Sequence, residues 1–178
     1  KAEKPMLFTR LSASQYLELE ESHSGLLAYD EVSKTAFFLI GDSRASVPVA
    51  VVTGGSSDLS VAREACRTLE FCGHEALEVH DVGVAGLWRM TERLEELRGC
   101  KIIICVAGMD AALPTVLGGL VSAALIAVPT SVGYGMVKGG ETALHSLLVS
   151  CAPGVTVTNI DNGYGAACAA IRILNSFA

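Results

Sequence analysis

Along residues 49–176, short runs that are apolar at every position alternate with segments in which apolar residues recur every three or four positions. Fully apolar runs are typical of strands buried on both faces of a sheet, and the longer spacing is typical of helices with one buried face. The clearest helix follows Asp58. Its predicted inward positions are Val61, Ala65, Leu69 and Cys72. Its predicted solvent-facing positions are Arg63, Glu64, Arg67 and Glu70.

The same pattern predicts about five strand–helix units. The predicted strands are 49–53, 76–81, 101–107, 124–128 and 155–160. The predicted helices are 59–72, 86–97, 111–121, 140–149 and 166–175. Because buried strands joined by helices form a parallel sheet covered on both faces, we expect a flavodoxin-like three-layer α/β sandwich with a parallel sheet of about five strands.

Residues 1–46 are different: they are polar, rich in Ser and Glu, and hold only two modest apolar runs, 25–28 and 35–40. We expect a short N-terminal element, with residues 1–46 as a partial N-terminal region and 47–178 as the main domain. Pro48 marks the expected boundary. The chain starts at Lys1 rather than Met, which leaves room for an upstream segment.

Composition narrows the function classes. Of 178 residues, 51% are hydrophobic and 18% are charged, so the chain has the apolar surface that a disordered protein lacks. Its apolar runs are far shorter than the roughly 20 residues of a membrane-spanning helix. The 13 basic and 19 acidic residues give a net charge of −6 with no basic cluster, which argues against nucleic-acid binding.

Six cysteines occur without a CxxC pair or zinc-ligand spacing, so we expect a reducing, cytoplasmic setting in which most of them pack as small hydrophobes. They are Cys66, Cys72, Cys100, Cys105, Cys151 and Cys168. Cys151 lies in the loop 150–154, between a helix and the last strand. No His or Lys is next to it in sequence, and on its own it is expected to be an inert buried thiol.

Ligands of such sheets bind at the carboxyl ends of the strands, so the loops after the strands hold the candidate site residues. In the first loop these are Gly54, Gly55, Ser56, Ser57 and Asp58. Their amides and hydroxyls suit a phosphate. Alternatively, Ser57 or Asp58 simply caps the following helix.

Four further loops carry weaker signals. The candidates after the second strand are Asp81, Gly83, Val84 and Arg89. Those after the third are Gly108, Met109 and Asp110. Those after the fourth are Thr130, Ser131, Gly133 and Tyr134, and those after the last are Asp161 and Asn162. Arg89 is either a clamp for a carboxylate or phosphate or a solvated helix residue, and the Tyr134 ring suits stacking on a flat ligand.

Several of these motifs, in this order and spacing, resemble one family. They are DVGVAG at 81–86, AGMD at 107–110, AVPTSVGYG at 127–135, SCA at 150–152 and NIDNG at 159–163. The resemblance covers roughly residues 47–176 and is to the LarB family, the carboxylase/hydrolase of nickel-pincer nucleotide biosynthesis.

The resemblance implies a PurE-like domain assembled as a homo-oligomer, commonly an octamer in that family. It implies conversion of nicotinic acid adenine dinucleotide, CO₂ or bicarbonate, and water into pyridinium-3,5-biscarboxylic acid mononucleotide and AMP. Cys151 matches the family's nucleophile and Asp110 the acid of phosphoanhydride hydrolysis. No organic cofactor is implied, and a Mg²⁺ ion at Asp110 is an open possibility.

Two features depart from a simple match. The family usually has Glu and Gly where this chain has Asp110 and Ala111, so the acid of the hydrolysis step is one methylene shorter here and has less reach, whereas carboxylation does not depend on it. Cys151 precedes its strand and therefore lies at the amino edge of the sheet, opposite the loops above. We predict that Cys151 enters the site of a neighbouring subunit.

Two alternatives stay open at this point. A PurE-like aminoimidazole ribonucleotide carboxylase or mutase would carry a proton-shuttling His in the loop that resembles 107–114, where this chain has Ala112. A non-catalytic nucleotide-binding regulatory module would keep the fold without turnover.

Overall fold

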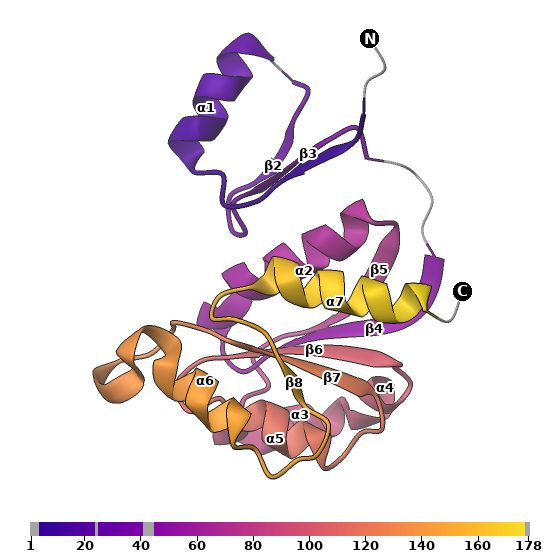
Figure 1. Cartoon of the computed structure of the whole chain (residues 1–178), viewed down its shortest axis with the longest axis vertical. Coiled ribbons are helices and arrows are strands. Elements are labelled where there is room, and N and C mark those ends of the chain that lie inside the picture. Colours follow the sequence, from indigo (N-terminus) through magenta and orange to yellow (C-terminus); the bar gives the residue numbers. More distant parts are fainter. Residues whose placement is uncertain (1–3, 24, 41–44, 177–178) are drawn as a thin grey trace.

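The computed structural model describes residues 4–23, 25–40 and 45–176, which form a small N-terminal sheet with one helix and a larger three-layer α/β unit (Figure 1). The strands of the larger unit are β4 (Ala45–Thr53), β5 (His74–Val79), β6 (Ile102–Ala107), β7 (Ala124–Pro129) and β8 (Thr156–Val157). Its α-helices are α2 (Leu59–Phe71), α3 (Leu87–Glu92), α4 (Leu94–Arg98), α5 (Ala112–Gly118), α6 (Glu141–Leu148) and α7 (Gly163–Asn175).

The larger sheet has the order β5-β4-β6-β7-β8, and all its neighbouring strands are parallel. Helices α2 and α7 cover one face, and α3 to α6 cover the other (Figure 1). This confirms the predicted flavodoxin-like sandwich. The chain leaves β4 to form β5 on one side and later returns to form β6 on the other. The strand order therefore reverses between β4 and β6, where such sheets leave a crevice.

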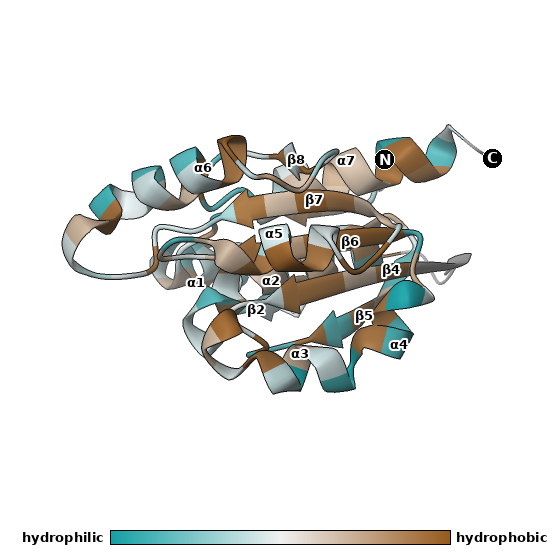
Figure 2. Ribbon diagram, turned by 90° about the horizontal axis from the view of Figure 1, so that it is seen from below, coloured by the Kyte–Doolittle hydropathy of each residue, from teal (hydrophilic) through white to brown (hydrophobic). Residues whose placement is uncertain are grey.

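The strands are apolar because both of their faces are covered. All six residues of β6 are buried, and β6 and β7 are brown over most of their length in Figure 2. Residues that alternate along each strand belong to two cores. Val51 and Ile104 pack towards α2 and α7, and Val52 and Ile103 pack towards α3, α4 and α5. Edge strand β5 is less buried and more polar.

Two predicted elements differ from the observed ones. The helix expected over 86–97 is divided into α3 and α4 at Arg93, whose φ and ψ of −100° and 4° are not helical. The strand expected over 155–160 pairs only at Thr156 and Val157. The neighbouring strand ends in Pro129, which has no N–H to donate, so the ladder stops early.

The N-terminal region forms an antiparallel sheet of order β1-β3-β2. Its elements are β1 (Met6–Phe8), α1 (Ala13–Ser22), β2 (Ala28–Asp30) and β3 (Thr35–Phe38). Ser12 and Gln15 form a capping box that starts α1. Of these elements, only β2 and β3 overlap the predicted apolar runs. Strand β4 begins at Ala45, just before the boundary expected at residue 47.

Two side chains of α2 that the sequence pattern had assigned to solvent are buried, Arg67 against the N-terminal sheet and Glu64 against the start of α7. Arg67 is only 9% exposed and Glu64 only 6%. Arg67 donates from Nε to Thr35 Oγ1 (3.1 Å) and from Nη2 to the carbonyl of Ala28 (2.6 Å). Its guanidinium carbon lies 3.6 Å from the centre of the Phe37 ring. The solvent-facing prediction was therefore wrong for these two residues.

None of the helices in the described part of the chain has the length and apolar character needed to cross a membrane. The six cysteines are free thiols. Cys66, Cys100 and Cys105 are buried, as expected for packing residues. Burial raises the pKa of the Cys66 and Cys105 thiols, which keeps them protonated and unreactive.

Candidate active site

A cleft of about 290 Å³ lies at the carboxyl ends of β4 and β6, at the point where the strand order reverses. We call it the switch-point cleft. Nine residues predicted from the sequence line it, namely Gly54, Gly55, Ser57, Asp58, Gly83, Val84, Gly108, Met109 and Asp110. Ala112, Leu113 and Val132 complete much of its wall. Three loops far apart in sequence therefore converge as expected.

Asp58 is the most constrained acid of the cleft and is only 3% exposed. Its Oδ2 accepts from the amide of Gly55 (2.8 Å), and its Oδ1 accepts from the hydroxyl of Thr130 (2.6 Å). Burial raises the pKa of Asp58, although these donors act in the opposite direction. The side chain makes no capping bond to α2, so the alternative of a plain helix cap is wrong for Asp58. It joins the first loop to the end of β7.

The loop after β6 is held in a strained turn. Met109 and Ala111 have φ values of 60° and 50°, in the left-handed region that a glycine adopts at lower cost. A Cβ on Gly108 would lie 2.4 Å from the carbonyl oxygen of Val132 and 2.6 Å from Thr130 Oγ1. Asp110 is exposed, and its Oδ1 accepts from the amide of Ala112 (3.3 Å). The turn thus holds a carboxylate at the rim of the cleft.

Several predicted residues lie outside the lining of this cleft. Arg89 Nη1 donates to Asp81 Oδ2 (2.7 Å), so the expected anion clamp is engaged by a neighbouring acid. Asn162 caps α7 by accepting from the amide of Gly165 (2.8 Å). Tyr134 is 79% exposed, with no described ring stacked on it. Thr130 is fully buried beneath the cleft. Ser56 and Gly133 are each next in sequence to a residue that lines the cleft.

Ser131 and Asp161 instead line a second, larger cleft of about 550 Å³. The amide of Ser131 donates to Asp161 Oδ1 (2.8 Å), which joins the loops after β7 and β8. The opposite wall of this second cleft is formed by residues of the N-terminal region, among them Arg10 and Lys34. Sequence reasoning missed these two cations because neither follows an apolar strand or lies in a glycine-rich loop.

Cys151 lies at the opposite edge of the sheet, in the short loop between α6 and β8. Its side chain is exposed, so the expectation of a buried thiol was wrong. The preceding residue fixes the loop, since Ser150 Oγ lies 2.7 Å from Thr115 Oγ1 and accepts from the amide of Ala152 (3.2 Å). The chain therefore presents this thiol outward on an anchored loop, away from its own switch-point cleft.

Among the described residues, no three His, Cys, Asp or Glu side chains converge to hold a metal ion. Both oxygens of Asp58 accept hydrogen bonds, and Oδ1 of Asp110 accepts one from Ala112, so among the described lining residues Asp110 Oδ2 is the carboxylate oxygen left for a Mg²⁺ ion. The donor set does not amount to a metal site held by the protein, and no step below is routed through a metal.

Comparison with known proteins decides the family. The model of the family described as AIR carboxylase matches residues 48–177. This chain belongs to the AIR carboxylase family. The match covers the larger α/β unit and every residue that lines the switch-point cleft, and the family is one of enzymes.

Three proteins with similar sequences show how much of the chain is shared with relatives. An uncharacterised protein of Methanocaldococcus jannaschii is 47% identical over 121 residues, which are 66% of this chain and 46% of the relative. This chain thus spans less than half the length of that relative. The N5-carboxyaminoimidazole ribonucleotide mutase of the same organism is 33% identical, with 71% of this chain and 78% of the mutase covered. The mutase of Pyrococcus abyssi is 35% identical, with 71% and 73% covered.

Solved structures agree on the fold. Treponema denticola PurE superposes with a TM-score of 0.62 and 24% identity, over 74% of this chain and 82% of that one. At this identity the likeness supports the fold alone. The sequence resemblance to the PurE-like domain is confirmed at the level of the AIR carboxylase family, and the particular reaction is a matter for proposal.

Proposed function

We propose that this AIR carboxylase family member carboxylates the pyridinium ring of nicotinic acid adenine dinucleotide at C5 and releases AMP, as its resemblance to the LarB family implies. The observation that carries this choice is the wall of the switch-point cleft. Ala112 stands where the mutases of the family are expected to carry a proton-shuttling His, and none of the four histidines lines the cleft. The cleft therefore lacks the imidazole that the rival reaction needs.

In the proposed reaction, the thiolate of Cys151 activates the pyridinium ring for carboxylation. A pyridinium ring is electron-poor and does not attack CO₂. Addition of the Cys151 thiolate to C4 forms a dihydropyridine whose C5 is an enamine carbon. C5 attacks CO₂, the proton at C5 leaves, and expulsion of the thiolate from C4 restores the aromatic cation. The net change exchanges one ring proton for a carboxylate and needs no oxidant. The cationic substrate itself favours the thiolate over the thiol.

The second half of the reaction is hydrolysis of the phosphoanhydride. Asp110, at the rim of the cleft, is the proposed acid that orients the attacking water. Since the amide of Gly55 is engaged by Asp58, Ser56 and Ser57 are the proposed phosphate donors of the first loop. The product, pyridinium-3,5-biscarboxylic acid mononucleotide, would serve nickel-pincer nucleotide biosynthesis.

The site requires more than one copy of the chain. Cys151 and the switch-point cleft are at opposite edges of one sheet, so a Cys151 that attacks the ring must come from a neighbouring subunit. We therefore propose a cytoplasmic homo-oligomer, on the family pattern an octamer, with sites shared between subunits. The exposure of Cys151 on an anchored loop supports this arrangement.

A second candidate is the carboxylase or mutase reaction on an aminoimidazole ribonucleotide. It is favoured by the two mutases that are 33% and 35% identical to this chain. It predicts turnover of a mononucleotide without any role for Cys151.

Mass spectrometry tests the proposal. The chain is incubated with nicotinic acid adenine dinucleotide and bicarbonate, and the products are analysed for a second ring carboxylate and for AMP. Cys151→Ala is expected to abolish the carboxylated product, whereas Cys72→Ala, which removes the other exposed thiol, is expected to leave it unchanged. Equal product from Cys151→Ala and the unmodified chain would refute the covalent mechanism.

A further inference from the structure

The larger of the two clefts described above, about 550 Å³ in volume, has no role in the reaction just proposed. It lies between loops 10–12 and 32–34 of the N-terminal region and the first turns of α2, and it extends to the loops after β7 and β8. Val132 lines both this cleft and the switch-point cleft, so the two are neighbours. We call it the N-terminal cleft. Its volume is within the ~300–1,000 Å³ usual for small-molecule sites.

Two cations, Arg10 and Lys34, line one wall of the N-terminal cleft. No described acid is within ion-pair distance of either. Both have left-handed backbones, with φ values of 56° and 53°, a conformation that costs free energy in residues other than glycine. The two loops are joined, because the amide of Leu11 donates to the carbonyl of Lys34 (2.8 Å). Two cations without an ion pair to a described acid therefore line one cleft. Burial raises the pKa of Glu64 in the same lining, and the charge of Arg10 acts to lower it.

Two acids also line the cleft, and one oxygen of each accepts a backbone hydrogen bond. Glu64 Oε2 accepts from the amide of Tyr164 (3.0 Å) at the start of α7, and Asp161 Oδ1 accepts from the amide of Ser131 (2.8 Å). Val61 and Ile160 add apolar surface between them. A ligand that fits has an anionic end for the cations and a flat, less polar body for the rest of the cleft.

We propose that the N-terminal cleft binds the AMP half of the dinucleotide, with its phosphate against Arg10 and Lys34. This rests on the proposed function, in which the pyridinium half occupies the switch-point cleft. At about 290 Å³ that cleft is at the lower limit of small-molecule sites and leaves no room for a second nucleotide. Arg10 and Lys34 lie outside residues 48–177, so this chain adds them to the part it shares with the family. In this proposal the N-terminal region adds a second nucleotide subsite, so that the two clefts together bind a dinucleotide.

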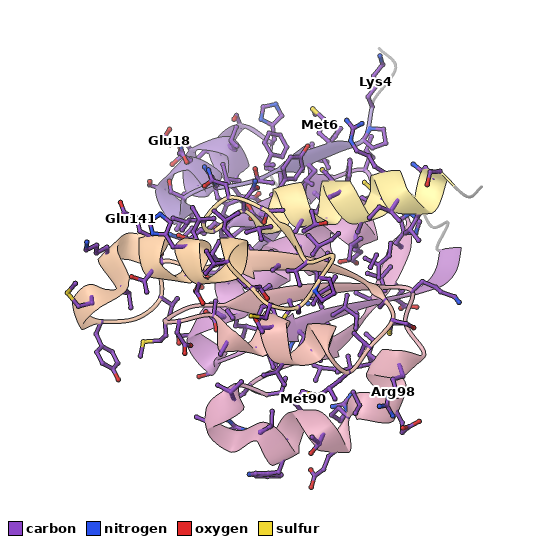
Figure 3. The ribbon with its side chains drawn as sticks, turned by 60° about the horizontal axis from the view of Figure 1, so that its bottom comes forward. Lys4, Met6, Glu18, Met90, Arg98 and Glu141 are labelled. Atoms are coloured by element: carbon purple, nitrogen blue, oxygen red, sulfur yellow. The ribbon has the colours of Figure 1, made fainter. Side chains whose placement is uncertain are left out.

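Titration calorimetry with AMP tests the proposal on the full chain. Arg10→Gln and Lys34→Gln are each expected to weaken AMP binding about 10- to 100-fold, because each removes a charge-assisted hydrogen bond. The matched control is Lys4→Gln, which removes the same charge from an exposed residue that projects away from the rest of the chain (Figure 3). It is expected to bind AMP as the unmodified chain does. Nicotinic acid mononucleotide is expected to bind all four proteins equally.

Two results would overturn the inference: no AMP binding by the unmodified chain, or equal AMP binding by it and by both cleft variants. Failure of the proposed function looks different. Charge-dependent AMP binding without carboxylation of the dinucleotide refutes the reaction and keeps the nucleotide site. Carboxylation of the dinucleotide with an unchanged KM in Arg10→Gln and Lys34→Gln refutes the site and keeps the reaction.

Discussion

The two edges of the parallel sheet differ in how tightly their polar side chains are held. At the carboxyl edge, Asp58 is 3% exposed and accepts hydrogen bonds at both oxygens, and the turn at Met109 and Ala111 is held in a left-handed conformation. At the amino edge, Cys151 is exposed on a short loop that is anchored through the hydroxyl of the preceding Ser150. The chain therefore builds the switch-point cleft from its own loops and leaves the Cys151 thiol exposed on the opposite edge.

The largest effect is expected in mixed oligomers, which test whether the cleft and the Cys151 thiol of one site come from different chains. Cys151→Ala lacks the thiol, and Ala112→Phe fills the switch-point cleft with a bulky ring, so each variant alone is expected to be inactive. Co-expression of the two variants with different tags is expected to restore about a quarter of the unmodified carboxylation rate. Only a site that takes its cleft from the Cys151→Ala chain and its thiol from the Ala112→Phe chain is active. Purified mixed oligomers that contain both chains and stay inactive would show that the site is not shared.

The tight carboxyl edge should be the more sensitive to added volume. Gly108→Ala places a methyl group against the Val132 carbonyl and the Thr130 hydroxyl, and it is expected to lower the free energy of unfolding by about 3 kcal/mol. Gly119→Ala is the control, because the nearest atom to its Cβ is 3.6 Å away. Urea unfolding of both variants measures the difference. Equal stabilities would mean that the carboxyl edge is looser than the structure indicates.

The N-terminal sheet contacts helix α2 through Arg67. Arg67→Met keeps an apolar stem but loses the bonds to Thr35 and Ala28 and the contact with Phe37, so a loss of about 2 kcal/mol is expected. Arg98→Met, at a more exposed position on α4 (Figure 3), is the comparison variant, because it loses bonds to Glu95 and Leu120 but no contact with the N-terminal sheet. If thermal unfolding is the same for both variants, the docking of the N-terminal sheet does not depend on Arg67.

The smallest expected effect concerns the charge of Asp58. Burial raises its pKa above the value in the unfolded chain, so the folded protein holds the proton more tightly. The stability contributed by the protonated form is greatest below about pH 4 and is lost as the pH rises through the raised pKa. Asp58→Asn removes this dependence. Its stability relative to the unmodified chain is therefore expected to increase from about pH 4 to pH 7 in urea unfolding.

A relative stability of Asp58→Asn that is flat or decreases over the same range would contradict the assignment. It would mean that the donors from Thr130 and Gly55 outweigh the cost of burial, and that the carboxyl edge is electrostatically relaxed.

Local pattern was enough to predict the parts of the molecule whose structure depends on neighbours in sequence. The apolar runs became β4 to β8, and the loops after them supplied nine residues of the switch-point cleft. The amino-edge position of Cys151 also followed from its place before the last strand. In each case one strand direction and one periodicity decide the outcome.

Features that depend on distant parts of the chain could not be predicted in this way. The hydrogen bond from Thr130 to Asp58 joins residues 72 positions apart, and the sequence around Asp58 does not predict it. Arg67 occupies a helical position that would face solvent if the N-terminal sheet did not cover it. That sheet has strands of three or four residues, too short for a periodic signal, and so the N-terminal cleft could not be predicted either.

One competition experiment tests the central claim most directly. The chain is given equal amounts of nicotinic acid adenine dinucleotide and aminoimidazole ribonucleotide together with ¹³C-labelled bicarbonate, and mass spectrometry follows the label. The account predicts labelled pyridinium-3,5-biscarboxylic acid mononucleotide, free AMP and an unlabelled imidazole nucleotide. Label in the imidazole nucleotide alone would contradict this expectation and would identify the chain as a carboxylase of aminoimidazole ribonucleotide.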